Sequence, residues 1–155
     1  MSFQFHALPA DQFSSLFKFS DDELANIRAR RMTVKSASGY PCRVSLKEAN
    51  IGEAVMLLNF EHQPVSSPYR SSHAIFVRKN AEQAFPEIGE VPEIFDRRII
   101  SLRAFDGKHD LIDADLMNGS DLSEAILTNF KNNEVRYLHL HNAKPGCFLC
   151  RVTRV

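Results

Sequence analysis

The stretch "YLHLHN", Tyr137–Asn142, carries two histidines at a spacing that could do chemistry. Side chains alternate between the two faces of a β-strand, so the tyrosine, His139 and His141 would share one face and the two leucines the other. Two imidazoles on one strand could bind a metal ion through nitrogen. Alternatively, one histidine could act as an acid or base, since its ordinary pKa is about 6.5, or both could be structural and bonded to backbone carbonyls.

A metal site on this strand would need at least one further ligand from elsewhere in the chain. The available residues are His62, His73, Glu61 and Asp115, and none of them lies at a spacing that fixes the choice. The metal and any cofactor therefore stay unknown at this point.

A second polar cluster lies in "NFEHQPVSSPYRSSHAIFVR", residues 59–78, where an apolar run breaks at Glu61 and His62 and resumes at His73. If the two flanking strands are neighbours, His62 and His73 face each other across the base of the intervening loop. That loop contains two prolines, which stiffen it, and four serines. With Tyr69 and Arg70, the serine hydroxyls offer donors suited to a carboxylate or a phosphate.

These two clusters predict a His/Arg/Tyr-lined pocket that binds or acts on a small anionic metabolite. The candidate catalytic residues are His73, His139 and His141, and the candidate ligand-binding residues are Glu61, His62, Tyr69, Arg70, Arg103 and Asn142. Arg103 is included because it lies on a predicted strand, where its side chain can point into a cleft. Arg43 and Arg78 also lie on or beside predicted strands. The alternative is a non-catalytic protein-interaction or regulatory module with structural histidines, and the sequence leaves open whether the protein is an enzyme.

The cysteines give weaker signals. "CFLC", Cys147–Cys150, matches the redox and zinc spacing, but positions i and i+3 of a strand point to opposite faces, so the two thiols would diverge. Cys147 alone is a weak candidate nucleophile, because a nearby imidazole could activate it. Cys42 is expected to be a small buried residue.

Composition narrows the class of protein. The chain has 155 residues, 44% hydrophobic and 25% charged, with 19 basic and 19 acidic side chains, which is typical of one globular domain and gives no reason to expect nucleic-acid or membrane binding. The N-terminal segment resembles no signal peptide, and the odd cysteine count favours free thiols, so we expect a reducing cytoplasm. The sequence does not indicate an oligomeric state.

Two helices and several strands are expected to position these residues. Helices are predicted at 21–31, where Ser20 can cap and Glu23 can close a capping box, and at 122–130, where Asp121 and Glu124 make a similar start. Strands are predicted at 42–46, at 54–60 as a central strand buried on both faces, and at 73–78 and 97–105 in one sheet. "KPGC", Lys144–Cys147, predicts a type II turn joining 135–141 to 147–154 as an antiparallel hairpin.

The order of these elements lacks a regular alternation of strands and helices. It therefore predicts an α+β fold: a single domain over residues 1–155, with a mainly antiparallel, strongly curved sheet and about two main helices.

The blocks "GYPCRVSL", "GEAVMLLNFEHQPVSSPYRSSHAIFVR", "ISLRAFD" and "YLHLHNAKPGCF" resemble a bacterial family of small proteins that carry a domain of unknown function. The resemblance spans nearly the whole chain. It implies a single cytosolic domain and brings no activity, cofactor or catalytic residue with it.

Overall fold

Two antiparallel sheets and two α-helices make up the computed structural model, which describes residues 1–155. The five-stranded sheet has the order β1 (Phe3–His6), β8 (Phe148–Arg154), β7 (Tyr137–Asn142), β5 (Ile99–Phe105), β6 (Leu111–Asn118). The three-stranded sheet has the order β2 (Ala29–Thr33), β3 (Ala54–Gln63), β4 (Ser71–Arg78). The helices are α1 (Asp21–Asn26) and α2 (Leu122–Asn129), and short 3-10 turns cover 10–12, 14–18, 93–95 and 119–121.

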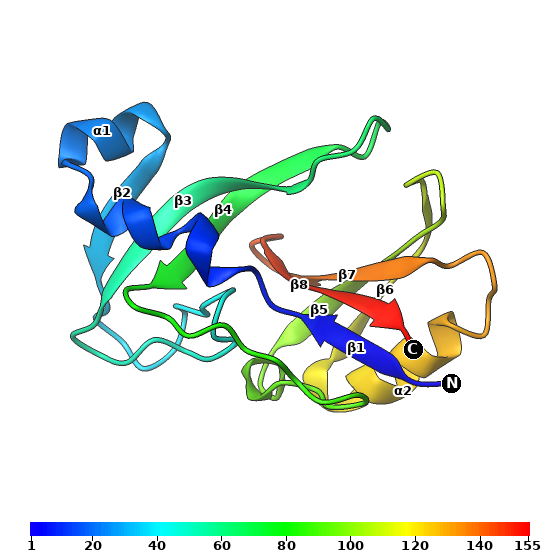
Figure 1. Cartoon of the computed structure of the whole chain (residues 1–155). Coiled ribbons are helices and arrows are strands. Elements are labelled where there is room, and N and C mark those ends of the chain that lie inside the picture. Colours follow the sequence, from blue (N-terminus) through cyan, green and yellow to red (C-terminus); the bar gives the residue numbers. More distant parts are fainter.

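The predicted α+β class with antiparallel pairing and two main helices is confirmed. The expectation that strands 73–78 and 97–105 share one sheet is wrong, because β4 pairs only with β3 while β5 pairs with β6 and β7. Both strands look alike in sequence, since each is a short apolar run, and the long connection between them carries the chain to the second sheet (Figure 1).

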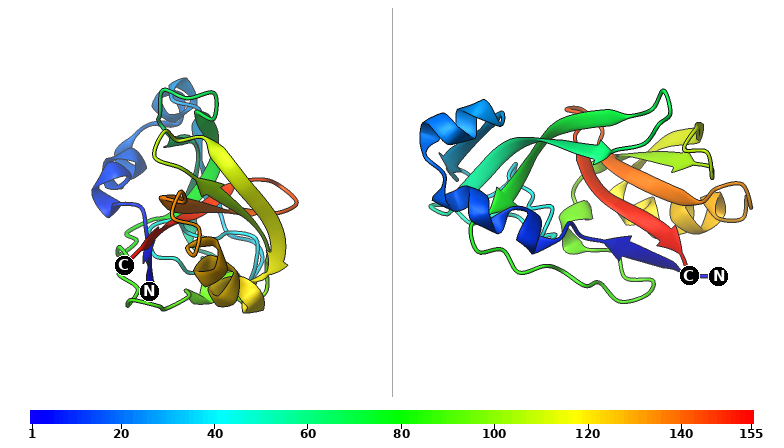
Figure 2. Two further views of the ribbon diagram at one scale, coloured as in Figure 1. Left: turned by 90° about the vertical axis from the view of Figure 1, so that its right-hand side faces the viewer. Right: turned by 45° about the horizontal axis from the view of Figure 1, so that its top comes forward.

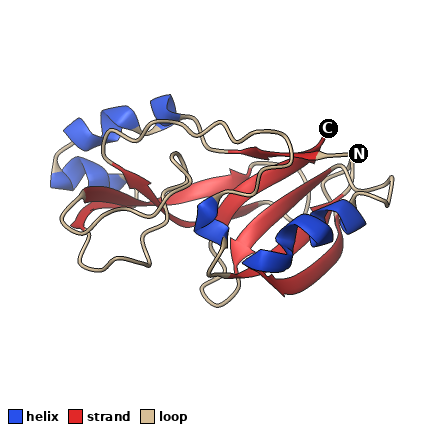
Figure 3. Cartoon of the chain, turned by 90° about the horizontal axis from the view of Figure 1, so that it is seen from below, coloured by secondary structure: helices blue, strands red, loops and turns tan.

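Helix α2 covers one face of the five-stranded sheet, as the view from below shows (Figure 3). Its apolar residues Leu122 and Ile126 pack in one buried cluster with Leu138 and Leu140 of β7 and Leu102 of β5. The alternation of "YLHLHN" therefore works as predicted: the leucines enter this core. Its histidines must then project from the opposite face of the sheet, which α2 does not cover.

A second apolar cluster lies around the three-stranded sheet and α1, toward the other end of the molecule (Figure 1). It contains Leu24 of α1, Met56 of β3, Ile75 of β4 and Cys42, which is fully buried as predicted. β3 is the central strand of its sheet, as predicted, but it is not buried on both faces: Met56 and Leu58 are buried, whereas on the opposite face Leu57 is partly exposed and Asn59 exposed.

The first predicted helix is shorter than its sequence signals indicated. The hydroxyl of Ser20 does cap it, accepting from the Glu23 amide at 3.2 Å, but the helix ends at Asn26 rather than Arg31. Arg28 takes a left-handed φ of 56°, and the chain then enters β2 beside β3. Pairing with an available strand edge outweighs the helix propensity of the arginine-rich segment. α2 matches its prediction, except that the Asp121 side chain forms no cap hydrogen bond.

Three further strands or turns differ from the sequence prediction. Residues 42–46 form a turn with isolated bridges instead of a strand, and β1 and β6 were not predicted. β1 pairs with β8, and the backbones of Ser2 and Val155 hydrogen-bond to each other, so the two termini lie side by side (Figure 2). No helix combines the length and the apolar character needed to cross a membrane.

The C-terminal hairpin is confirmed: β7 and β8 pair antiparallel through the turn that contains Gly146. Gly146 has a φ of 81°, the left-handed value that the third position of a type II turn requires. A bulge between Leu140 and His141 shifts the register, so that His139 pairs with Arg151 and His141 with Phe148.

Candidate functional site

A row of basic side chains crosses the five-stranded sheet on the face away from α2. The strand registers place Arg103 of β5 beside His139 of β7, His139 beside Arg151 of β8, and Arg151 beside His6 of β1. Cross-strand neighbours on one face have Cβ atoms about 5 Å apart, so this row concentrates positive charge around one buried imidazole. We call Arg103, His139 and Arg151 the basic row.

Two further histidines meet His139 of the basic row, so that three imidazoles lie together. His62, from the end of β3 in the other sheet, lies against His139 and His141, with ring centroids 5.9 Å and 5.0 Å away. Each of the three offers a nitrogen, and these nitrogens lie within 4.8 Å of one another. We call His62, His139 and His141 the histidine cluster. Such a set could hold one metal ion, and of the four third-ligand candidates only His62 joins the strand pair.

Hydrogen bonding within the histidine cluster is incomplete. The Nδ1 atom of His141 is 2.9 Å from the carbonyl oxygen of Gly146, which fixes that ring. The Nδ1 atoms of His62 and His139 are buried and have no hydrogen-bond partner. Buried polar atoms are almost always satisfied, and these two nitrogens have no partner within the protein, so they are available to a ligand or an ion.

The cluster is neutral at physiological pH. The pKa is lowered to about 4 for His62, about 2 for His139 and about 3 for His141; burial is the largest cause, and the nearby guanidinium of Arg103 contributes to all three. His139 and His141 are only 2% and 1% exposed. A neutral imidazole keeps a lone pair, so each ring is able to accept a hydrogen bond or to ligate a cation.

Aromatic rings enclose the histidine cluster. Phe148 stacks flat on His62, with centroids 5.0 Å apart and planes 9° apart, and meets His139 and His141 edge-on. Phe105 and Tyr137 lie against the other side of His139. These contacts account for the burial of His139 and His141, while His62 stays partly exposed.

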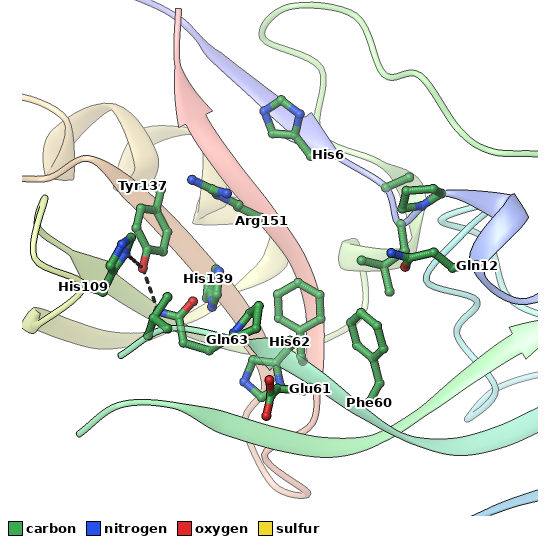
Figure 4. A pocket seen from close by; sticks show the side chains of 16 residues that line it. His6, Gln12, Phe60, Glu61, His62, Gln63, His109, Tyr137, His139 and Arg151 are labelled. Atoms are coloured by element: carbon green, nitrogen blue, oxygen red, sulfur yellow. Dashed lines mark hydrogen bonds between the residues drawn. The ribbon is translucent and has the colours of Figure 1, made fainter. Parts of the chain in front are cut away.

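A cavity of about 400 Å³ opens beside the cluster and the basic row, lined by residues of both sheets that include His62, His139 and Arg151 (Figure 4). At its edge the Tyr137 hydroxyl accepts from the Gln63 amide at 2.6 Å and lies 2.9 Å from Nδ1 of His109. These contacts tie the end of β3 to the five-stranded sheet. They therefore hold His62 against the strand pair from the other sheet.

Neither arginine of the basic row has an acidic partner. The ion pairs of the structure involve Arg31, Arg70, Arg78 and Arg98 only. Arg103 donates from Nε to the Ser101 hydroxyl at 3.3 Å, and the Arg151 guanidinium lies 4.4 Å from the centre of the Tyr137 ring. Both keep donors free for an anion, because a guanidinium has five.

The remaining sequence-predicted residues lie around this centre rather than within it. Arg70 forms a two-pronged ion pair with Glu61, at 3.1 Å and 2.8 Å. Tyr69 is partly exposed and meets Phe105 edge-on, 6.3 Å between centroids. His73 is half-buried and its Nε2 lies 3.1 Å from the carbonyl oxygen of Pro145, so it contacts the hairpin turn instead of the histidine cluster.

Asn142 and the two neighbouring cysteines belong to the hairpin turn and to the core. The Asn142 side chain donates to the Cys147 sulfur at 3.1 Å. Cys150 is buried in the core behind the sheet, hydrogen-bonded to the carbonyl oxygen of His6, and burial raises its pKa to about 12. All three cysteines are free, as predicted, and the thiols of "CFLC" have different partners.

Sequence reasoning missed Arg151, Gln63 and His109. Arg151 could have been found, because the predicted hairpin puts the central residues of its second strand opposite His139. Gln63 and His109 had no such signal, since their place in the site depends on how the two sheets meet.

No curated protein and no solved structure matches the chain. A family model described as "protein of unknown function (DUF1203)" matches residues 39–154, a stretch that includes the histidine cluster and the basic row. The chain therefore belongs to this family of proteins of unknown function.

Proposed function

We propose that the protein binds a small anionic metabolite in the cavity beside the basic row. The observation that carries the proposal is that Arg103 and Arg151 flank His139 on one face and that neither forms an ion pair. Guanidinium groups bind carboxylates and phosphates through paired hydrogen bonds, and a partly enclosed site strengthens such bonds.

The size and lining of the cavity support a small ligand. A volume of about 400 Å³ lies within the range of pockets that hold metabolites. Apolar walls from Phe60, Val65 and Phe148 would cover a short carbon skeleton, and polar side chains from both sheets and from the N-terminal segment complete the lining. In this proposal Arg151, which lines the cavity, takes the anion-holding role that the sequence suggested for Arg70. Arg103 lies on the other side of His139 and does not line the cavity, so it adds only a more distant positive charge.

The alternative, an interaction module whose histidines are purely structural, requires those histidines to have structural partners. Of the three Nδ1 atoms only that of His141 has a hydrogen-bond partner, whereas those of His62 and His139 have none. This pattern favours a ligand site over a structural role.

Titration calorimetry with inorganic phosphate and with succinate, on chelator-treated protein, tests the proposal. Arg151→Met should weaken binding by about tenfold or more, the usual effect of losing a charge-assisted hydrogen bond. Arg103→Met should weaken it less, because Arg103 does not line the cavity. Arg30→Met is the matched control, because Arg30 is exposed on β2 in the other sheet. Absence of binding to either anion, or equal weakening by all three variants, would contradict the proposal.

A further inference from the structure

We propose that His62, His139 and His141 form a binding site for one divalent transition-metal ion of the zinc type, with a fourth coordination position open to the cavity. The inference goes beyond anion binding and does not depend on it, since a guanidinium pair can hold an anion without a metal. It rests on the convergence of three imidazoles from two sheets and on their unpartnered nitrogens.

The number and type of ligands suit such an ion. Imidazole nitrogen is a preferred ligand of zinc, copper and nickel, and three histidines with one open position is a common set for zinc. Ions of this type hold nitrogens at about 2.0–2.1 Å, so a tetrahedral site needs them roughly 3.4 Å apart. The nitrogens here lie within 4.8 Å, so small rotations of the rings would bring them to coordination distance.

The hydrogen bond of His141 prepares that ring for coordination. A carbonyl oxygen can only accept, so the neutral ring must donate from Nδ1 to Gly146 and keep its lone pair on Nε2. Metal-binding histidines usually donate their other nitrogen to a carbonyl or carboxylate in this way, which fixes the tautomer. The Phe148 ring, stacked on His62, supplies the apolar support that often surrounds such sites.

The unpartnered nitrogens give an independent reason. His139 is 2% exposed, and its Nδ1 lies buried without a partner, as does the Nδ1 of the half-buried His62. Leaving two buried polar atoms without a hydrogen bond is costly, and an ion bound at these nitrogens would satisfy them.

The surrounding charges restrict what completes the site. Three neutral imidazoles leave the charge of a divalent ion uncompensated, and the closest fixed charges include the guanidinium of Arg103. Glu61, next to His62 in sequence, is already paired with Arg70. The fourth ligand should therefore be an anion or a hydroxide, and its binding would be favoured by the basic row.

Cobalt is a suitable probe, because Co²⁺ replaces zinc and absorbs visible light intensely when its coordination is tetrahedral. Untagged, chelator-treated full-length protein should bind one Co²⁺ per chain with such absorption. His62→Phe should abolish the absorption and lower affinity by about tenfold or more while keeping the stacking on Phe148. His6→Phe is the matched control, because His6 lines the same cavity outside the cluster, and it should bind as the unsubstituted protein does.

A second measurement on the unsubstituted protein covers the case in which a variant fails to fold. Nitrogen-15 NMR of the imidazoles should show zinc-induced shifts at His62, His139 and His141, and not at His6, His73 or His109. Stoichiometric Co²⁺ giving no tetrahedral absorption, equal binding by the unsubstituted protein and His62→Phe, or zinc shifts confined to the other three histidines would each overturn the metal site. Phosphate binding to the metal-free protein tests the anion site alone, so failure of one proposal can be told from failure of the other.

Discussion

Nδ1 of His141 lies 2.9 Å from the carbonyl oxygen of Gly146, so the turn of the hairpin determines which nitrogen of a histidine in the cluster carries the proton. The carbonyl can be aimed in this way because Gly146 adopts a φ of 81°, which other residues rarely take. The chemistry of the site is thus linked to one glycine five residues away from the histidine.

Gly146→Ala should destabilise the protein by about 1 kcal/mol, because alanine is strained at positive φ, and should also weaken the bond to His141. Gly52→Ala is the matched control: Gly52 has a φ of 89° with nothing near its added Cβ, and it lies outside the hairpin that bonds His141. Chemical denaturation should give similar losses of stability for both variants. Only Gly146→Ala should change the nitrogen-15 NMR signals of His141, and identical spectra would contradict the link.

Stability of the metal-free protein should fall with acidification. Unfolded histidine titrates near 6.5, whereas the folded pKa values are about 4 for His62, about 2 for His139 and about 3 for His141. Below pH 6.5 the unfolded chain therefore binds more protons than the folded chain, and unfolding becomes easier. Between about pH 8 and about pH 5 the free energy of unfolding should fall by about 2 kcal/mol for each fully buried imidazole, as measured by urea titration. A flat profile would show that the rings keep ordinary pKa values.

His139→Leu should leave the stability of the metal-free protein at neutral pH unchanged or raise it by about 1 kcal/mol, because it removes a buried nitrogen that has no partner. His141→Leu is the comparison, since it leaves the Gly146 carbonyl without its imidazole donor and should cost about 1 kcal/mol. Thermal denaturation of chelator-treated protein measures both. Equal destabilisation by the two variants would favour a structural role for His139.

Tyr137→Phe should destabilise the protein by about 1–2 kcal/mol, because its hydroxyl bonds both the Gln63 amide and the His109 ring. Amide exchange near the end of β3 should quicken in this variant. Tyr69→Phe is the matched control, since Tyr69 is partly exposed and its hydroxyl makes no hydrogen bond within the protein, and it should change stability by less than about 0.5 kcal/mol. Equal effects of the two substitutions would mean that the hydroxyl of Tyr137 does not hold β3 in place.

The sequence predicted best where local rules decide the structure. Alternation placed the leucines of "YLHLHN" in the core, and the Pro-Gly pair predicted the turn and the hairpin. The Ser20 cap was found at the first helix, but the end of that helix was misplaced, because pairing of β2 with β3 is a long-range interaction. Likewise, nothing in the two apolar runs that became β4 and β5 indicated that they belong to different sheets.

The candidate site was predictable only in part for the same reason. His139 and His141 share a face by strand period alone, and His62 was one of four possible companions. Its selection depends on how the end of β3 crosses the five-stranded sheet, which also brings Gln63 to Tyr137. The sequence suggested Arg70 as the anion ligand, but Arg70 forms an ion pair with Glu61, nine residues earlier.

Anomalous diffraction from crystals soaked in selenate, a heavy analogue of small oxyanions, tests most directly whether the basic row binds an anion. The selenium peak is expected in the cavity beside His139, with the selenate oxygens within hydrogen-bond distance of the Arg151 guanidinium. Selenium bound only at other arginines, with none at the basic row, would contradict the account.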